Sequence, residues 1–343
     1  MSTALRVALV GAGRAGMVHG RDFAAGVPGA RLVAVADRSE EACAAAAAEL
    51  GVDRTLHDPL DAATDDAVDA VVVAAPTPVH ADVAVAALAA GKHVLCEKPI
   101  SNTLDGARRV RDAAAASPGV LLMGFMRRFD AGFARVAERI AAGDIGEPLL
   151  VRSTTRGPGL PPEWAWDTKL SGGLAAEVNS HDIDTVRWLS GQEPVKVHAV
   201  GRAAKRPDIA ESHPGFVDVL AATFEMSDGA LAQVDGACPA DYGYDARVEV
   251  YGSEGTLLVG GPTEAGGALL VRPGSSTADP VRSWRSLFAE AYRAEDRHFV
   301  AAARGEEEPR TTAEDGYQAL ATVLAINRSM ASGTPVAVSE VTG

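Results

Sequence analysis

A chain of 343 residues is too long for one ordinary domain and suits two, each able to bury a core of its own. Hydrophobic residues at 47% and charged residues at 23% are typical of folded globular proteins and argue against long disordered tracts. A formal net charge of −14, with no local cluster of Lys and Arg, argues against nucleic acid and anionic membranes as partners and favours a small, neutral substrate.

The cysteines and the apolar runs indicate the compartment. Three cysteines lie far apart and form no CxxC pair, which argues against a disulfide framework or a structural zinc site and favours a reducing compartment. Residues 1–10 lack the pattern of a signal peptide, and no apolar run approaches the ~20 residues of a membrane helix. The sequence therefore predicts a cytoplasmic protein with no membrane partner.

Short apolar runs alternate with helical segments in the first third of the chain. Strands are predicted at 5–10, 32–36, 70–74, 93–96 and 120–123, with an alanine-rich helix at 39–50. Continuous apolar strands that alternate with helices indicate an α/β domain with a doubly wound parallel sheet covered on both faces. We place this first domain at residues 1–124.

A different pattern follows in residues 125–343. Helices are predicted at about 130–142, 174–190 and 313–332, and a strand at 148–155. Turn-forming residues at 227–229 and 252–255 indicate hairpins, and hence a mixed, largely antiparallel sheet in an α+β domain. Gly- and Pro-rich stretches at 157–162 and 260–267 are predicted loops, and the helix at 313–332 is a candidate to pack on the first domain.

The segment Gly11–Gly16 reads GAGRAG, a GxGxxG motif between a predicted strand and a predicted helix. Gly11 permits a tight turn, Gly13 lets the backbone approach a pyrophosphate, and Gly16 allows close helix packing. An ordinary glycine turn is the alternative, but Asp37 ends the next strand at the spacing of a ribose 2′-hydroxyl partner. The predicted dinucleotide-binding residues here are Gly11, Ala12, Gly13, Arg14, Ala15, Gly16, Asp37 and Arg38.

The pair at 37–38 bears on the choice of cofactor. Asp37 favours NAD because its carboxylate would repel the additional phosphate of NADP. Arg38 points the other way, since a guanidinium pairs with a 2′-phosphate or stacks on adenine. We predict NAD, with NADP as the alternative.

Glu97-Lys98-Pro99 follows a predicted parallel strand, at the edge where doubly wound sheets bind ligands. A lysine at this edge faces the cofactor, and Pro99 restricts Lys98 to an extended conformation. Glu97 is placed to orient or tune the amine. A surface salt bridge on a loop is the alternative interpretation.

A second polar cluster lies in the run SGGLAAEVNSHDID at 171–184. Glu177 and His181 are four residues apart on the predicted helix and so share a face, which Asp184 and Trp188 continue. The functional interpretation is a proton-transfer pair. The alternatives are a helix-surface ion pair or half of a metal site, and because no third ligand with suitable spacing is visible we predict no metal.

These motifs together resemble one family. GAGRAG, PTPVH at 76–80, EKP at 97–99 and GG…E…HDID at 172–184 are similar to the glucose-fructose oxidoreductase/inositol dehydrogenase family (Gfo/Idh/MocA). Within it, GFMRRFD at 124–130 and YGYD at 242–245 resemble inositol 2-dehydrogenases in particular. The resemblance spans nearly the whole chain. It implies an NAD-binding Rossmann domain and a C-terminal domain whose open sheet serves homo-oligomerisation, as a tetramer or dimer.

The resemblance also implies roles for single residues. Lys98 and His181 match the family's catalytic lysine and histidine, and Glu177 stands where inositol dehydrogenases usually have aspartate, a departure that bears on the substrate more than on the reaction. The implied cofactor set gains Ala75, Pro76, Thr77, His80, Glu97 and Lys98, and the implied substrate set is Met126, Arg127, Glu177, His181 and Tyr242. The structural alternatives are a helix N-cap, a core methionine, a surface arginine and a buried tyrosine.

The predicted function is NAD-dependent oxidation of a secondary alcohol on a cyclic polyol or sugar. His181 is assigned as proton acceptor, Lys98 as the group that hydrogen-bonds the reacting oxygen, and Glu177 as an orienting or substrate-binding acid, with the roles of Lys98 and His181 open to exchange. The alternatives are a ketoreductase of sugar or aminocyclitol biosynthesis, a non-catalytic NAD-binding sensor or repressor, and NAD-dependent glycoside cleavage.

Overall fold

The computed structural model describes residues 4–263 and 269–343, and its contacts divide the chain into two compact units. Unit 1 comprises Met1–Phe129 and Ala289–Leu320, and unit 2 comprises Asp130–Phe288 and Ala321–Gly343. The predicted division into 1–124 and 125–343 misses the return of residues 289–320 to unit 1. That return depends on contacts between residues far apart in sequence.

Unit 1 is built on a six-stranded parallel sheet in the order β3-β2-β1-β4-β5-β6. The strands are β1 (Leu5–Val10), β2 (Ala30–Ala36), β3 (Thr55–Leu56), β4 (Ala70–Val73), β5 (His93–Glu97) and β6 (Leu121–Gly124). This is the strand order of a Rossmann fold, so the prediction of a doubly wound sheet is confirmed. The order reverses between β1 and β4, and ligands bind beside the carboxyl ends of the strands at such a point.

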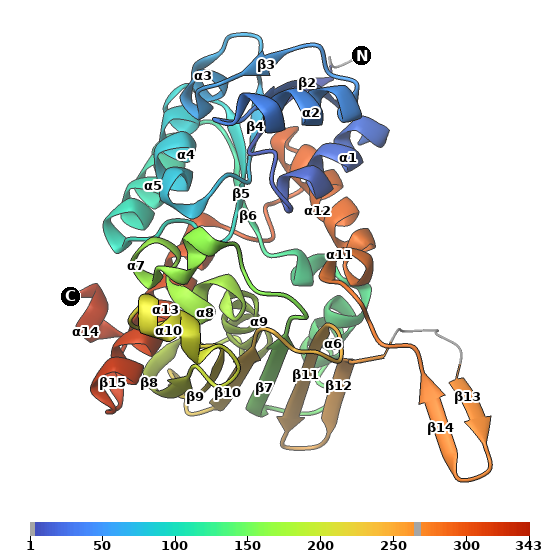
Figure 1. Ribbon diagram of the computed structural model, residues 1–343, viewed down its shortest axis with the longest axis vertical. Helices are drawn as coiled ribbons and strands as arrows, with labels where there is room; N and C mark the ends of the chain where they lie inside the picture. The colour runs from blue at the N-terminus through green and yellow to red at the C-terminus, as the bar shows by residue number, and fades with distance from the viewer. Residues whose placement is uncertain (1–3, 264–268) are drawn as a thin grey trace. The chain divides into compact units, whose positions relative to one another are not determined.

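Helices cover both faces of this sheet. They are α1 (Gly16–Gly26), α2 (Glu40–Leu50), α3 (Pro59–Thr64), α4 (His80–Ala89), α5 (Leu104–Ala116) and α12 (Ala289–Ala303), with 3₁₀ turns η1 (Thr77–Val79) and η2 (Met126–Phe129). In Figure 1, α3, α4 and α5 lie on one face and α1, α2 and α12 on the other. Helix α13 (Ala313–Ser332) belongs to unit 1 as far as Leu320 and to unit 2 beyond it.

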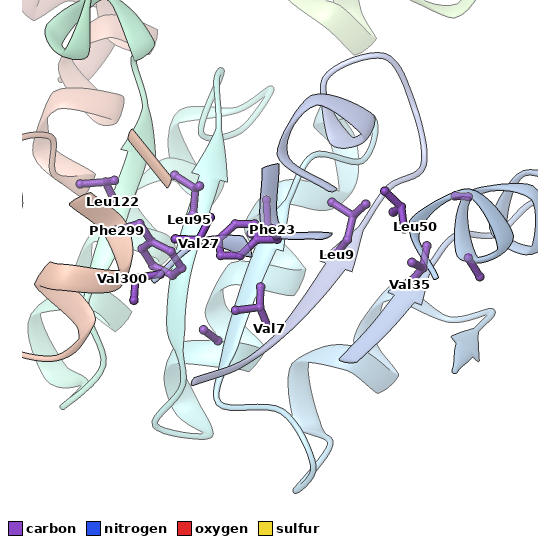
Figure 2. Close-up of a cluster of buried hydrophobic side chains, with 14 of the residues drawn as sticks. Val7, Leu9, Phe23, Val27, Val35, Leu50, Leu95, Leu122, Phe299 and Val300 are labelled. Atoms are coloured by element: carbon purple, nitrogen blue, oxygen red, sulfur yellow. The ribbon is translucent and has the colours of Figure 1, made fainter. Parts of the chain in front are cut away.

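A buried apolar cluster explains why the late segment belongs to unit 1. Val7, Leu9 and Val35 from the strands meet Phe23 of α1 in this cluster. Phe299 of α12 is fully buried in the same cluster, and Figure 2 shows it beside Leu95 and Leu122. Burying a side chain of this size stabilises the fold by about 1.5–3 kcal/mol, so α12 is an integral layer of unit 1.

Unit 2 contains a seven-stranded sheet in the order β12-β11-β7-β10-β9-β8-β15. The strands are β7 (Pro148–Arg156), β8 (Pro194–Arg202), β9 (Val219–Met226), β10 (Leu231–Ala237), β11 (Asp245–Gly252), β12 (Thr256–Gly261) and β15 (Val336–Ala337). The β7–β10 pair is parallel and the other pairs are antiparallel. The prediction of a mixed, largely antiparallel sheet is confirmed.

One face of the unit 2 sheet is covered by helices and the other is open. Strand β9 alternates exposed and buried residues along its length, as expected of a sheet with one buried face. Helices α6 (Ala131–Ala141), α8 (Gly173–Glu177) and α9 (Ser180–Ser190) pack on the buried face. The open face carries apolar side chains, among them Val200 at 59% and Leu258 at 71% exposure.

Short elements complete unit 2. They are α7 (Thr168–Ser171), α10 (Pro207–Ser212), α11 (Trp284–Leu287), α14 (Ser339–Thr342), η3 (Glu163–Trp166) and a separate hairpin of β13 (Leu269–Arg272) and β14 (Ser275–Ala278). Residues 157–162 form a loop as predicted. Of the loop predicted at 260–267, residues 260–261 end β12 instead, and 264–267 lie outside the described residues. None of the helices in the described ranges is both long and apolar enough to cross a membrane.

Candidate active site

The three glycines of GAGRAG differ in what surrounds them. Gly11 has a φ of +100°, and a Cβ there would lie 2.5 Å from the Ala75 backbone nitrogen. A Cβ at Gly16 would collide with the Gly11 carbonyl oxygen, whereas a Cβ at Gly13 would meet nothing within 4 Å. Gly11 and Gly16 are therefore needed by the fold itself. Gly13 leaves an open space beside the start of α1, which fits the approach of a pyrophosphate to backbone N–H groups.

Asp37 connects the end of β2 to this loop. One carboxylate oxygen accepts a hydrogen bond from the Ala12 N–H at 2.8 Å, and the other accepts one from the Ser39 N–H at 2.9 Å. Asp37 thus fixes the glycine loop, a structural task that sequence spacing did not predict. Arg14 and Arg38 are both exposed.

His80 joins two of the predicted cofactor segments. Its Nε2 lies 2.6 Å from the Ala75 carbonyl oxygen and its Nδ1 lies 2.8 Å from the Pro99 carbonyl oxygen. His80 is buried at the start of α4, directly after η1, where Thr77 is also buried. The loop after β4 and the EKP segment after β5 are therefore held side by side at the carboxyl edge of the sheet.

Glu97 is buried, so the alternative of a surface salt bridge is wrong for this residue. One of its oxygens accepts the Lys98 backbone N–H at 3.0 Å, and the other lies 3.3 Å from His19 Nε2. His19 Nδ1 lies 2.7 Å from a carboxylate oxygen of Asp296 on α12. Lys98 itself is half-buried.

Met126 and Arg127 lie in the 3₁₀ turn η2, directly after β6. Both side chains are buried, and Arg127 is among the largest fully buried side chains in the described residues. The alternative of a surface arginine is therefore wrong. Met126 is buried, as the alternative of a core methionine predicts.

The predicted helix at 174–190 is broken between Glu177 and His181. Helix α8 ends at Glu177, and α9 begins at Ser180. The Asn179 N–H bonds to the Leu174 carbonyl, five residues back, so the chain widens by one residue relative to an α-helix. The continuous helix that the i, i+4 spacing of Glu177 and His181 assumes is therefore not formed.

Asn179 is the cause of the break. Its side-chain amide donates to Asp182 at 2.8 Å and to the Asp235 carbonyl of β10 at 3.1 Å. A Cβ on the neighbouring Gly236 would occupy the position of the Asn179 side chain. A contact with a strand 56 residues further along the chain therefore overrides local helix propensity.

Asp182 fixes the first turn of α9. It is fully buried, and one of its oxygens accepts hydrogen bonds from Ser153 at 2.6 Å and Thr155 at 2.9 Å, both on β7. The other oxygen accepts from Asn179. Charge-assisted hydrogen bonds of this kind are the strong ones, so the neighbouring His181 stands on a rigid support. His181 itself is buried.

Tyr242 is 45% exposed, so the alternative of a buried tyrosine is wrong. Its hydroxyl donates to Asp245 at 2.8 Å. Partial burial, together with the hydrogen bond and charge of Asp245, raises the pKa of Tyr242 above its usual value. The phenol therefore remains neutral at physiological pH and serves as a hydrogen-bonding group.

The predicted residues fall into two sets. The predicted cofactor residues, together with Met126 and Arg127, belong to unit 1, whereas Glu177, His181 and Tyr242 belong to unit 2. Within residues 4–263 and 269–343, no group of three or more His, Cys, Asp or Glu side chains is arranged to hold a metal ion.

Sequence reasoning missed His19, Asp296, Asn179 and Asp182. The available signal was polar residues at positions where the surrounding pattern is apolar or small. His19 faces the sheet three residues after Gly16, and Asp296 lies on the buried side of α12. Buried charged groups are rare unless they are paired, so a charged or titratable residue on a predicted core face indicates a buried partner.

Comparisons with known proteins agree over nearly the full length. Residues 5–125 match the family model described as "Oxidoreductase family, NAD-binding Rossmann fold" (GFO_IDH_MocA), and residues 137–338 match "Oxidoreductase family, C-terminal alpha/beta domain". The chain is 33% identical to scyllo-inositol 2-dehydrogenase (NAD(+)) of Bacillus subtilis, over 98% of this chain and 97% of that protein. It is 31% identical to myo-inositol 2-dehydrogenase of Thermotoga maritima, over 99% of this chain and 100% of that protein.

A solved structure gives the same result. The crystal structure of scyllo-inositol dehydrogenase from Lactobacillus casei, with bound NAD(H) and scyllo-inositol, superposes with a TM-score of 0.91 at 28% identity. The match covers 98% of this chain and 100% of that one.

Proposed function

The chain belongs to the Gfo/Idh/MocA oxidoreductase family, and on this premise we propose that it is an NAD-dependent dehydrogenase that oxidises a secondary alcohol of a cyclic polyol, an inositol. The observation that carries the proposal is the similarity to inositol 2-dehydrogenases over nearly the whole chain. The glycine loop of unit 1 supports it, because the loop keeps open the approach that a dinucleotide pyrophosphate requires.

We assign cofactor binding to the carboxyl edge of the unit 1 sheet. Gly13 and the first turn of α1 would receive the pyrophosphate, and Asp37 would accept from the adenosine ribose hydroxyls. Ala75, Thr77 and His80 would border the nicotinamide ribose. Asp37 disfavours the 2′-phosphate of NADP, which makes NAD the cofactor of this proposal.

The proposed chemistry divides one alcohol into a hydride and a proton. Bound NAD would supply the acceptor for the hydride that leaves the carbinol carbon. The Lys98 ammonium donates a hydrogen bond to the reacting oxygen, and the His181 imidazole accepts the hydroxyl proton. Glu177 accepts hydrogen bonds from neighbouring polyol hydroxyls. The alcohol becomes a ketone, and the proton leaves through the imidazole.

We further propose that the protein is a cytoplasmic homo-oligomer, a tetramer or dimer. The open face of the unit 2 sheet supports self-association because it exposes Val200, Leu231, Tyr251 and Leu258. Cys43, Cys96 and Cys238 are buried and are not joined in disulfides, as suits a reducing compartment. Light scattering of the purified protein tests the proposed oligomeric state, since a strictly monomeric mass contradicts it.

The test of function is a substrate screen that follows NADH absorbance with myo-inositol, scyllo-inositol, other inositols and pyranoses. We expect activity with an inositol, and we expect Lys98→Ala and His181→Ala each to lower kcat by about 10²–10⁴-fold with NAD binding retained. Activity only in the direction of ketone reduction would favour a biosynthetic ketoreductase. NAD binding without turnover, unchanged in both variants, would favour a sensor.

A further inference from the structure

Three buried side chains, two carboxylic acids and one imidazole, form a hydrogen-bonded network that ends at the backbone of Lys98. Asp296 Oδ1 lies 2.7 Å from His19 Nδ1, His19 Nε2 lies 3.3 Å from Glu97 Oε1, and Glu97 Oε2 accepts the Lys98 N–H at 3.0 Å. None of the three side chains is more than 5% exposed. The network joins α12, α1 and the end of β5, which all belong to unit 1.

The charge state of each side chain in this network depends on the groups beside it. Burial opposes a charged imidazole, but the charges and hydrogen bonds of Asp296 and Glu97 together raise the pKa of His19 well above its usual value. Burial alone would favour neutral Glu97, yet the hydrogen bond and charge of His19 lower the pKa of that carboxyl. The pair is therefore an imidazolium beside a carboxylate at neutral pH. Asp22 of α1 and the Tyr292 ring of α12 also face His19.

The Glu97 carboxylate has little freedom to choose another orientation. The Cα of Glu97 and its carboxyl group both pack against Gly124 of β6, where a Cβ would approach them to within about 3.0–3.2 Å. On the opposite side of Lys98, the Pro99 carbonyl oxygen is held by His80. The Glu97–Lys98 peptide before Lys98 and the Pro99–Ile100 peptide after Pro99 are thus each held by a buried side chain.

We propose that His19 and Asp296 are positioning residues for Lys98. They hold the Glu97 carboxylate in the orientation in which it accepts the Lys98 backbone N–H. In that orientation the carboxylate also provides a fixed negative charge beside the lysine. This inference rests on the proposed catalytic role of Lys98. It also gives α12 a second role, because Asp296 on this helix, nearly 200 residues downstream of the EKP segment, holds His19 in place.

The matched variants are His19→Gln and His298→Gln. His298 is also a buried histidine, lies on α12 and pairs with a carboxylate, Glu307, at 2.8 Å. Its other ring nitrogen accepts the Arg310 N–H at 3.1 Å, so its contacts lie away from Glu97. Both substitutions remove a buried imidazole of unit 1 that pairs with a carboxylate, although Glu307 is 48% exposed. Only His19 contacts the EKP segment.

We expect His19→Gln to lower kcat by about 10- to 100-fold, with KM and the NAD dissociation constant changed less than threefold. Without the imidazolium, burial raises the pKa of Glu97, so the acidic limb of the kcat–pH profile moves to higher pH. Asp296→Asn, which keeps the shape of the side chain, should give a smaller loss of kcat. His298→Gln should leave kcat and the acidic limb unchanged.

A second measurement does not depend on turnover. Lysines at 92, 98, 169, 196 and 205 are labelled by reductive methylation with ¹³C-formaldehyde, and the Lys98 resonance is assigned from its loss in Lys98→Arg. We expect that resonance to shift in His19→Gln and Asp296→Asn but not in His298→Gln. This measurement decides the question through Asp296→Asn if His19→Gln fails to fold.

The outcomes separate the two proposals. If the wild-type protein oxidises no polyol while the Lys98 resonance responds to Asp296→Asn, the proposed function fails and the link from Asp296 to Lys98 stands. If folded His19→Gln matches His298→Gln in kcat, pH profile and Lys98 resonance, the positioning proposal is overturned while the dehydrogenase proposal stands.

Discussion

Gly13→Ala should separate cofactor binding from folding at the glycine loop. A Cβ at this position meets no protein atom within 4 Å, and the backbone φ of Gly13 is not in the left-handed region. Replacing a glycine in such a conformation by alanine stabilises a protein by about 0.4–1 kcal/mol, because the unfolded chain loses freedom. We therefore expect the melting temperature to stay level or to rise by about 1–4 °C.

The same methyl group would occupy the space through which a pyrophosphate approaches the start of α1. Losing one hydrogen bond to a charged phosphate oxygen costs about 1.5–3 kcal/mol. Since 1.4 kcal/mol is a factor of ten, the NAD dissociation constant should rise by roughly 10- to 140-fold. Titration of NAD against intrinsic protein fluorescence measures this change, and calorimetric melting reports on the fold.

Gly159→Ala is the matched control. Gly159 lies in unit 2, a Cβ there also meets nothing within 4 Å, and its φ is not positive either. It should share the small effect on melting and leave NAD affinity unchanged. If folded Gly13→Ala binds NAD within threefold of the wild type, the pyrophosphate does not pass Gly13 and the assignment of this loop is refuted.

Three further predictions concern single carboxylates. Asp37→Ala should lower kcat/KM with NAD and narrow the preference over NADP; a wild type that prefers NADP contradicts the assignment. Glu177→Asp should change relative kcat/KM among inositol isomers and pyranoses, and Glu177→Gln should lower activity on all of them; an unchanged profile with an active Gln variant places Glu177 outside the substrate site. Asp182→Ala should lower the free energy of unfolding in urea by at least about 3 kcal/mol, because buried donors from Ser153, Thr155 and Asn179 lose their acceptor; a loss under 1 kcal/mol rules out the anchor.

The parallel sheet was predictable because its signal is local. Five of the six strands of unit 1 contain an apolar run that the sequence shows, and GxGxxG identifies the first crossover. The two-residue strand β3 was missed because it is too short to show a period. The return of α12 to unit 1 was missed because the sequence of a helix does not show which sheet the helix covers. The burial of Phe299 in the core of unit 1 determines its place.

A sequence predicts candidate site residues where a residue type in a given context has a specific chemistry. Lys98 after a strand and Asp37 after a strand are such cases. The partners that hold these residues were not predictable, because they come from distant segments. The Asp37 carboxylate is engaged by the loop backbone, and the acid that orients His19 lies 277 residues away at Asp296.

The break before His181 shows why helical periodicity alone does not place side chains at such a site. Helical spacing places Glu177 and His181 on one face only if every residue between them is helical, and the contact of Asn179 with β10 removes that condition. The rigid support of His181 comes instead from Asp182, whose partners lie on β7. A methylene gained at Glu177 therefore extends an arm from the end of α8, independently of the turn that holds the imidazole. We therefore expect a change of side-chain length at Glu177 to alter substrate preference while His181, the proposed proton acceptor, keeps its support from Asp182.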